Sequence, residues 1–263
     1  MNEFRLEPET LSFTLISKGR RECRACALKT KESASLPAGR SFVKIYEMKD
    51  YVQPSKYELS GEPFKKSEAD GYEELAVFSE AHGKTAFGSY GKEMMEDVLS
   101  IISDRAKELE KYGFGRNIAA SSYLKGHGYF DMVILDIPSN ETGKCKECQY
   151  VKNAGNREIY SDDHFSVYSA FAPKHEIEIS VSPKSHVSMA GSDPVILFGI
   201  ADITKKLISL LGDDITVSLM ESGDGHVKLR ICSGEVGPFE ALSISHVYTN
   251  PEEMSKELRD KLR

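Results

Sequence analysis

Two Cys-x-x-Cys pairs, each followed at a distance by two histidines, constrain the fold of this chain more than any other feature of its sequence. The same order occurs twice: Cys23, Cys26, His82 and His127 in the first half, then Cys145, Cys148, His186 and His226 in the second. Two thiolates and two imidazoles form a complete tetrahedral ligand set for structural zinc, with no open position for catalysis. The sequence therefore predicts an internally duplicated protein with two zinc ions per chain, one in each half.

Other uses of the cysteines stay open at this point. A Cys-x-x-Cys pair in a cytosolic protein can be redox-active. The two pairs can also share one metal, although a zinc ribbon usually places only about 15–20 residues between its pairs, far fewer than lie between Cys26 and Cys145. Disulfides are disfavoured because Cys232 makes the cysteine count odd and because no secretory signal precedes the pairs.

Composition excludes several classes of protein. A chain of 263 residues can bury one large core or two smaller ones. Its 34 basic and 41 acidic residues give a net charge of −7, which argues against non-specific nucleic-acid binding. No apolar run approaches the roughly 20 residues of a membrane span, and the N-terminus lacks the pattern of a signal peptide. We therefore expect a cytoplasmic protein that binds no membrane.

One amphipathic helix is predicted in each half, after the first histidine of the set. In the first half, apolar residues recur at helical spacing and Gly113 ends the pattern: Met94, Met95, Val98, Ile101, Ile102 and Leu109. In the second half, Asp193 is the expected N-cap, Pro194 the first-turn residue and Gly212 the stop. The apolar stripe between them is Ile196, Ile200, Ile203, Leu207 and Leu211.

Strand-like segments follow or precede each helix. Residues 129–137 form one such run, and 215–220 and 226–231 are predicted to pair around a turn-rich segment. The stretch 175–182 alternates between apolar and polar residues, as a half-buried strand does. The predicted linkers are 55–71 and 138–144. This order predicts an α+β protein with an antiparallel sheet and two domains, 1–138 and 139–263.

The running order of these segments resembles the galactose-1-phosphate uridylyltransferases, which are built from two histidine-triad (HIT) domains. In the second half, the Cys145 pair, 159–165, 182–187 and 226–231 follow the order of a HIT domain. Residues 3–21 resemble the family's opening segment, and residues 73–82 resemble the stretch that carries a zinc-binding histidine. Residues 117–127 resemble the loop before the active-site histidines, and residues 250–259 resemble the closing helix. The resemblance implies two tandem HIT-like domains related by a pseudo-twofold axis, a nucleotide or nucleotide sugar as ligand, and a homodimer.

The same resemblance shows which residues are missing. Family enzymes carry His-x-His-x-Gln in the first half, and the second histidine attacks the α-phosphorus of a nucleotide sugar to form a nucleotidyl-histidine. Here the matching run is His127-Gly-Tyr129-Phe-Asp131. In the second half, His-x-His-x-His is replaced by His226-Val-Lys-Leu-Arg. Each half therefore keeps the residue that matches a zinc ligand and lacks the histidines after it, so we expect a retained fold without nucleotidyl-histidine transfer.

Tyr129 and Asp131 are the candidate catalytic residues that remain. A tyrosine, with a reference pKa of about 10, needs a base or a cation before it can act as a nucleophile. Asp131 is two residues further along a strand and faces the same side, so it can serve as a general base for Tyr129 or for water. A charged carboxylate there would also repel phosphate oxygens. An active nucleotidyltransferase or phosphohydrolase is therefore the alternative hypothesis.

The candidate nucleotide-binding residues are Arg20, Asn117, Ser121, Ser122, Lys228 and Arg230. The resemblance implies that the asparagine and the serines wrap the phosphates and that Arg20 or its neighbour Arg21 meets one of them. The two cations of the 226–231 strand face one side and suit an anion, but they can equally neutralise acidic neighbours. In a third hypothesis, the ligand pocket is vestigial and the duplicated, zinc-stabilised scaffold serves as a module for protein or nucleic-acid interaction.

Overall fold

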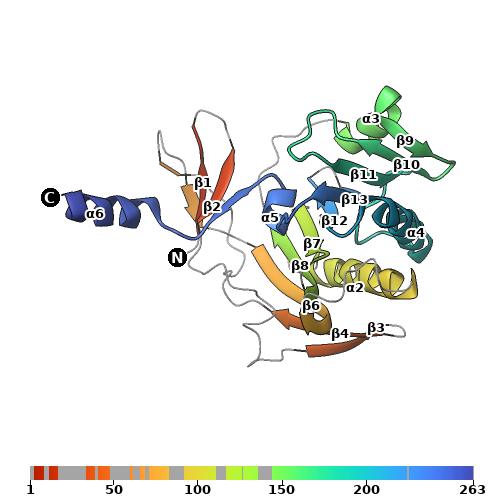
Figure 1. Ribbon diagram of the computed structural model, residues 1–263, viewed down its shortest axis with the longest axis horizontal. Helices are drawn as coiled ribbons and strands as arrows, with labels where there is room; N and C mark the ends of the chain where they lie inside the picture. The colour runs from red at the N-terminus through yellow and green to blue at the C-terminus, as the bar shows by residue number, and fades with distance from the viewer. Residues whose placement is uncertain are drawn as a thin grey trace.

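The computed structural model describes residues 3–8, 12–16, 34–38, 41–47, 60–61, 66–68, 71–82, 92–110, 117–125, 127–135, 144–223 and 225–262. The fold is mixed α+β, with a large sheet and a small one (Figure 1). All neighbouring strands of the large sheet are antiparallel. In spatial order they are β3 (Ala34–Ala38), β4 (Ser41–Glu47), β6 (Gly71–His82), β8 (His127–Leu135), β7 (Asn117–Tyr123), β12 (Ile215–Ser222), β13 (His226–Ser233), β11 (Glu178–Pro183), β10 (Phe165–Ser169) and β9 (Glu158–Ser161).

The strand order of the large sheet reads alike from both edges. If only the strands of this sheet are numbered within each half of the chain, the order from either edge inward is first, second, third, fifth and fourth. In each half a long helix follows the third strand: α2 (Lys92–Glu110) after β6 and α4 (Pro194–Leu211) after β11. The halves meet where β7 pairs with β12, and there Ser121 stands opposite Ser218 with 2.8 Å between the two Oγ atoms.

The small sheet joins the two ends of the chain. Its order is β14 (Ser245–Val247), β2 (Phe13–Ile16), β1 (Glu3–Leu6) and β5 (Lys66–Glu68), with β14 parallel to β2. An ion pair of 2.7 Å between Arg5 and Glu252 adds to this connection. The predicted linker 55–71 therefore contains a short strand, β5, which pairs with β1, and its last residue begins β6.

Helices α2 and α4 pack side by side on one face of the large sheet (Figure 1). The predicted limits of α4 are confirmed: the carboxylate of Asp193 accepts a hydrogen bond of 2.8 Å from the Val195 amide, and Gly212 ends the helix at φ 84°. Gly113, the predicted end of the first helix, lies outside the described residues. No helix in the described part of the chain has both the length and the apolar character of a membrane span.

The main core lies between this helix pair and the sheet. In α4 the fully buried face is Leu197, Ile200, Ala201, Thr204 and Ile208. Of the predicted stripe, only Ile200 belongs to this face, and the other members are partly buried at its margins. Helix α4 also comes close to β10 at Gly199, where an added Cβ would lie 2.3 Å from the ring of Phe165.

The remaining helices are short or peripheral. They are α3 (Lys146–Lys152), the 3-10 turn Gly155–Arg157, α5 (Pro238–Ala241) and α6 (Pro251–Leu262). Helix α5 lies against β7, β8 and β12, on the face of the sheet opposite α2 and α4 (Figure 1). Helix α6 extends away from the rest of the chain and has no buried residue (Figure 1).

Among the predicted strands, the pair 215–220 and 226–231 is confirmed as β12 and β13. The run 129–137 corresponds to β8, which begins two residues earlier. The alternating stretch 175–182 corresponds to β11, which begins three residues later.

Candidate metal centre and ligand pocket

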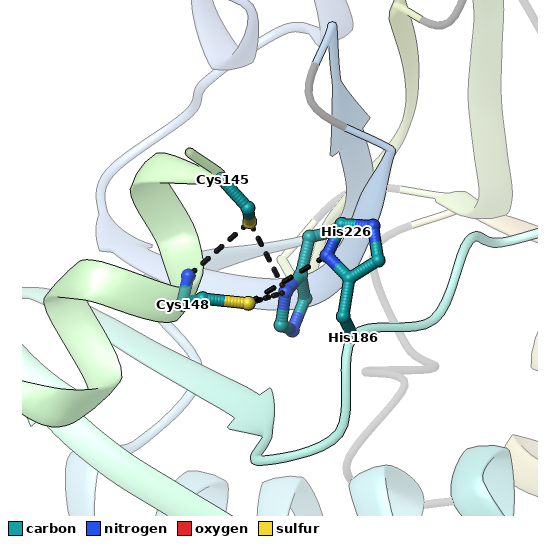
Figure 2. Close-up of side chains that lie close together, drawn as sticks. All are labelled: Cys145, Cys148, His186 and His226. Carbon is teal, nitrogen blue, oxygen red and sulfur yellow. Dashed lines mark hydrogen bonds between the residues drawn. The ribbon is translucent and has the colours of Figure 1, made fainter. Parts of the chain in front are cut away.

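Four side chains from three separate segments converge in the second half (Figure 2). Cys145 and Cys148 lie at the start of α3, His186 lies in the loop after β11, and His226 begins β13. Their sulfur and nitrogen ligand atoms all lie within 4.8 Å of one another. This is the second of the two ligand sets that the sequence predicts, and it is a group that can hold a metal ion.

The spacing of these atoms fits a tetrahedral ion. Nδ1 of His226 lies 3.5 Å from the sulfur of Cys145 and 3.3 Å from that of Cys148, and Nδ1 of His186 lies 3.6 Å from the sulfur of Cys148. A tetrahedral zinc with bonds of about 2.3 Å to sulfur and 2.0–2.1 Å to nitrogen requires about 3.6 Å between these ligand atoms. The two imidazole rings are nearly perpendicular, at 85°.

Contacts behind the ligands hold them in this arrangement. His226 is buried, and its Nε2 lies 3.0 Å from the carbonyl oxygen of Pro183 and 3.3 Å from the hydroxyl of Ser182. A donor bond from Nε2–H to that carbonyl makes Nδ1 the ring nitrogen that can bind a metal. The amide of Cys148 donates to the sulfur of Cys145 over 3.3 Å, at the N-cap of α3, where negative charge is favoured.

The first ligand set is described only in part. His82 and His127 are register partners on β6 and β8, so strand pairing brings their backbones opposite each other. Cys23 and Cys26 lie outside the described residues.

Lys228, a predicted anion-binding residue, is held in an internal ion pair. Its Nζ lies 2.6 Å from Oε2 of Glu147, a buried residue between the two cysteines of α3. Glu147 also accepts a hydrogen bond from the hydroxyl of Tyr168. Burial and then the charge of Glu147 raise the pKa of Tyr168, so the phenol stays a donor. The positive charge of Lys228 is therefore compensated within the protein.

Arg230, two residues further along β13, is held in a similar way. Its Nη1 lies 3.4 Å from Oε1 of Glu178, and its Nη2 donates to the carbonyl of Ala241 over 2.6 Å. The guanidinium thus ties β13 to β11 and to α5. Cys232 follows on the same strand and is buried, which raises the pKa of its thiol to about 11 and keeps it protonated.

Tyr129 and Asp131 line a pocket of about 580 Å³ on the face of the sheet that α5 partly covers. Ser121 lines it as well, so the structure brings one predicted ligand-binding residue together with both candidate catalytic residues. Apart from Tyr123 of β7, the other walls come from distant segments of the second half. The full lining is Ser121, Tyr123, Tyr129, Asp131, His175, Glu235, Val236, Gly237, Pro238, Phe239, Glu240, His246 and Tyr248.

Aromatic rings form one wall of this pocket. The ring centroids of Phe239 and His246 are 4.6 Å apart, and those of His246 and Tyr248 are 4.4 Å apart. Tyr123 donates its hydroxyl hydrogen to Asp214 over 2.8 Å. This hydrogen bond raises the pKa of Tyr123 to about 12, so the phenol stays neutral.

The pocket is acidic. The described residues that line it include three carboxylates, those of Asp131, Glu235 and Glu240, two histidines, and no lysine or arginine. Asp131 is only 9% exposed, whereas the two glutamates are exposed. No sequence motif marks the two glutamates, His175 or His246, because each comes from a loop or a short element that only the folded chain brings to the pocket.

The remaining predicted ligand-binding residues lie elsewhere. Ser122 is the register partner of Val217, which belongs to the core under α2 and α4, so strand alternation turns Ser122 toward that core. Asn117 lies at the far end of β7 and is not part of the pocket lining. Arg20 and Arg21 lie outside the described residues.

No family model matches this sequence. A galactose-1-phosphate uridylyltransferase from Thermotoga maritima is 25% identical over 222 residues, which cover 72% of this chain and 68% of the relative. The resemblance to the galactose-1-phosphate uridylyltransferases is confirmed. The uridylyltransferase-like fold extends over almost the whole chain: a solved uridylyltransferase superposes with a TM-score of 0.63 at 16% identity and covers 97% of this chain and 96% of its own.

Two plant proteins of Arabidopsis thaliana share the uridylyltransferase-like fold. A protein described as GalT-like has a TM-score of 0.58 at 20% identity and covers 98% of both chains. An ADP-glucose phosphorylase with bound ADP-glucose has a TM-score of 0.57 at 16% identity and covers 97% of this chain and 98% of its own. At these identities the likeness concerns the fold.

Proposed function

We propose that this chain is a zinc-containing, uridylyltransferase-like protein that binds a nucleotide or nucleotide sugar without forming a nucleotidyl-histidine. The observation that carries the proposal is the position of Tyr129 and Asp131. Both line the pocket from β8, at the two places where the family resemblance implies a nucleophilic histidine and a glutamine. The ADP-glucose held by one structural neighbour supports a nucleotide sugar as ligand.

The chemistry of these two side chains argues against transfer. A phenol with a pKa of about 10 is protonated at neutral pH and attacks phosphorus poorly. The carboxylate of Asp131 is buried. It would repel a phosphate charge about 6 Å away by roughly 3 kcal/mol at an effective dielectric constant of about 20. This repulsion opposes the placement of a phosphate next to Tyr129.

We propose that the metal is zinc and that the chain holds two ions. The ligand spacing around Cys145, Cys148, His186 and His226 supports the second site. The opposed positions of His82 and His127 support the first, with Cys23 and Cys26 completing it.

We also propose an internal duplication, with domains at 1–138 and 139–263. Its support is the strand order, which reads alike from both edges, and the register across the centre of the sheet. Asp131 pairs with Ser121, Ser121 with Ser218, and Ser218 with Arg230, so the two motif strands stand at equal distances from the junction. The pairing of β14 with β2 returns the C-terminal segment to the first domain.

Two further features are proposed on other grounds. We propose a cytoplasmic location because the thiols of Cys145 and Cys148 are reduced, as thiolate metal ligands are in that compartment. A homodimer follows from the family resemblance, and the mass of the particle in solution tests it.

An active nucleotidyltransferase or phosphohydrolase is the second candidate. One observation favours it: Tyr129, Asp131 and Ser121 line the same pocket, so a nucleophile, a base and a hydrogen-bond donor are available together.

Labelling separates the two candidates. The protein is incubated with a nucleotide sugar that carries a radioactive α-phosphate, then denatured and searched for label on the chain. We expect no adduct, together with a rise in melting temperature because the ligand binds the folded state. An acid-labile adduct on any histidine would overturn the proposal. An adduct that disappears in the Tyr129→Phe variant would establish the second candidate instead.

A further inference from the structure

One ligand of the candidate metal centre is held less directly than the others. Cys145, Cys148 and His226 lie at the starts of α3 and β13. His186 lies in the loop between β11 and α4, and it is exposed (Figure 2). The second ring nitrogen of His226 is fixed by the carbonyl of Pro183. Within the described part of the chain, the ring of His186 makes a polar contact only with Cys148 and a ring contact only with His226. Its orientation therefore depends on the backbone of its loop.

Two hydrogen-bonded anchors hold this loop. The first is next to His186 itself: the amide of Val227 donates to the carbonyl of Val187 over 2.8 Å, so the residues that follow His186 and His226 are joined. One hydrogen bond of this kind fixes a point but lets the loop pivot about it. A second anchor further along the loop removes that freedom.

The second anchor is Met189, which is completely buried in the main core. Its amide donates to the carboxylate of Glu221 on β12. Its carbonyl accepts a hydrogen bond of 2.8 Å from the hydroxyl of Ser103 on α2. Glu221 is 1% exposed and Ser103 is 2% exposed, so water does not compete for either hydrogen bond. A helix from the first half of the chain thus holds the loop that carries a candidate metal ligand of the second half.

We propose that Glu221 and Ser103 are positioning residues of the candidate metal centre, which act on His186 through the backbone of Met189. The inference rests on the proposed function, because it takes the bound metal as zinc. When the anchor at Met189 is weakened, His186 pivots away from the ion and water replaces it, since the imidazole is exposed. The other ligands stay on α3 and β13. The centre then still binds zinc but releases it faster.

The rate of zinc release to a chromophoric chelator tests the proposal. Ser103→Ala removes one hydroxyl and leaves the rest of α2 unchanged. Loss of one hydrogen bond corresponds to a change of about three- to tenfold in an equilibrium constant. Because this loss weakens the bound state, we expect zinc release from this centre to be about three to ten times faster. The phase that Cys148→Ser abolishes identifies the release from this centre.

Glu221 gives a second pair of variants. Glu221→Gln keeps an oxygen that can accept from the amide of Met189, whereas Glu221→Met has a similar size and no such acceptor. We expect zinc release to be about tenfold faster in Glu221→Met, the lower end of the effect of residues that orient a metal ligand, and to change less in Glu221→Gln. After zinc is replaced by cobalt(II), the absorption spectrum of Glu221→Met should shift toward that of His186→Ala, which lacks the ligand.

Thr216→Val is the matched control. Thr216 is fully buried and lies near the opposite end of β12 from Glu221. Its hydroxyl donates to the carbonyl of Gly234 over 2.7 Å and accepts from the amide of Val236 over 2.9 Å. The variant removes a buried hydroxyl that binds loop backbone, as Ser103→Ala does, and should lower the free energy of unfolding at least as much. Its zinc release and its cobalt(II) spectrum should equal those of the parent.

The outcomes separate this inference from the proposed function. If the parent protein binds no metal, the proposed zinc fails and the inference fails with it. If the parent binds zinc, and Ser103→Ala and Glu221→Met release it at the parent's rate, the zinc stands and the positioning role is wrong. Ser103→Ala decides alone if Glu221→Met does not fold. Release that is equally fast in Thr216→Val would assign the effect to a general loss of stability and would also overturn the inference.

Discussion

The two motif strands β8 and β13 occupy equivalent places in the large sheet but differ in what their side chains do. On β8, Tyr129 and Asp131 open onto a pocket of about 580 Å³. On β13, Lys228 and Arg230 stand in the same positions relative to the first histidine of the motif, and each is tied to a glutamate. The same scaffold thus presents a pocket on the motif strand of the first half and an ion-pair network on that of the second. In this sense the first half is the open half and the second is the closed half.

The difference follows from what burial requires of each residue. A cation that is mostly removed from water needs a partner, or it costs several kcal/mol. Lys228 pairs with Glu147, which lies between Cys145 and Cys148 at the start of α3. Arg230 pairs with Glu178 on the neighbouring strand β11. In the open half, the position that matches Lys228 holds Tyr129, so no cation there needs such a partner. The positions that follow the first histidine therefore line a pocket in one half and form ion pairs in the other.

The largest effect should come from breaking the candidate metal centre, which belongs to the closed half. We expect Cys148→Ser to lower the zinc content by one ion per chain and to destabilise the fold by several kcal/mol, because binding of a structural zinc can contribute about 10 kcal/mol or more to folding. Metal analysis and thermal melting measure the two effects. Cys232→Ala, which removes a thiol outside the ligand set, should keep the metal. An unchanged zinc content in Cys148→Ser would contradict the ligand assignment.

The next largest effect should come from the ion pair beside the metal centre. Lys228→Met leaves the buried carboxylate of Glu147 without its cation, and a broken buried pair typically costs about 3–5 kcal/mol. Urea denaturation measures this loss. The combined change Lys228→Met with Glu147→Gln should recover part of it, since the two residues interact directly. Equal destabilisation by Lys228→Met and by Tyr129→Phe would remove the distinction between the closed half and the open half.

At the junction of the halves, Ser121→Ala and Ser218→Ala should each cost about 1 kcal/mol, because each removes one side of a buried hydroxyl–hydroxyl hydrogen bond. If the two positions are equivalent, the two single changes should cost the same. The double change should cost less than their sum. Additive effects would show that the hydroxyls do not interact across the junction.

The smallest effect concerns the wall of the open pocket. Tyr123 has its pKa raised from 10 to about 12 by Asp214, so its contribution to stability is present below pH 10 and is lost as the pH rises through about 12. Tyr123→Phe should cost less than about 1 kcal/mol at neutral pH, because the hydrogen bond is exposed to water. The variant and the parent should become equally stable near pH 12. A constant difference across this range would assign the loss to packing instead.

Local patterns in the sequence determined the limits of one helix, one pair of strands and the residues of the candidate metal centre. The limits of α4 follow from the capping side chain of Asp193 and from Gly212, and the β12–β13 pair follows from apolar alternation around a turn. The four residues that meet at the candidate metal centre follow from ligand type and order along the chain. The absence of the nucleophilic histidine is also a fact of the sequence alone.

Only the tertiary structure decided how the two halves differ. Alternation shows that Lys228 and Arg230 share a face of their strand, but their partners lie on α3 and β11, which reach them through strand order and helix placement. The acidic pocket likewise combines β7 and β8 with His175, Glu235 and His246 from the second half. Sequence periodicity is local and extends over a few residues, whereas these contacts join segments about 50 to more than 100 positions apart, so packing alone determines them.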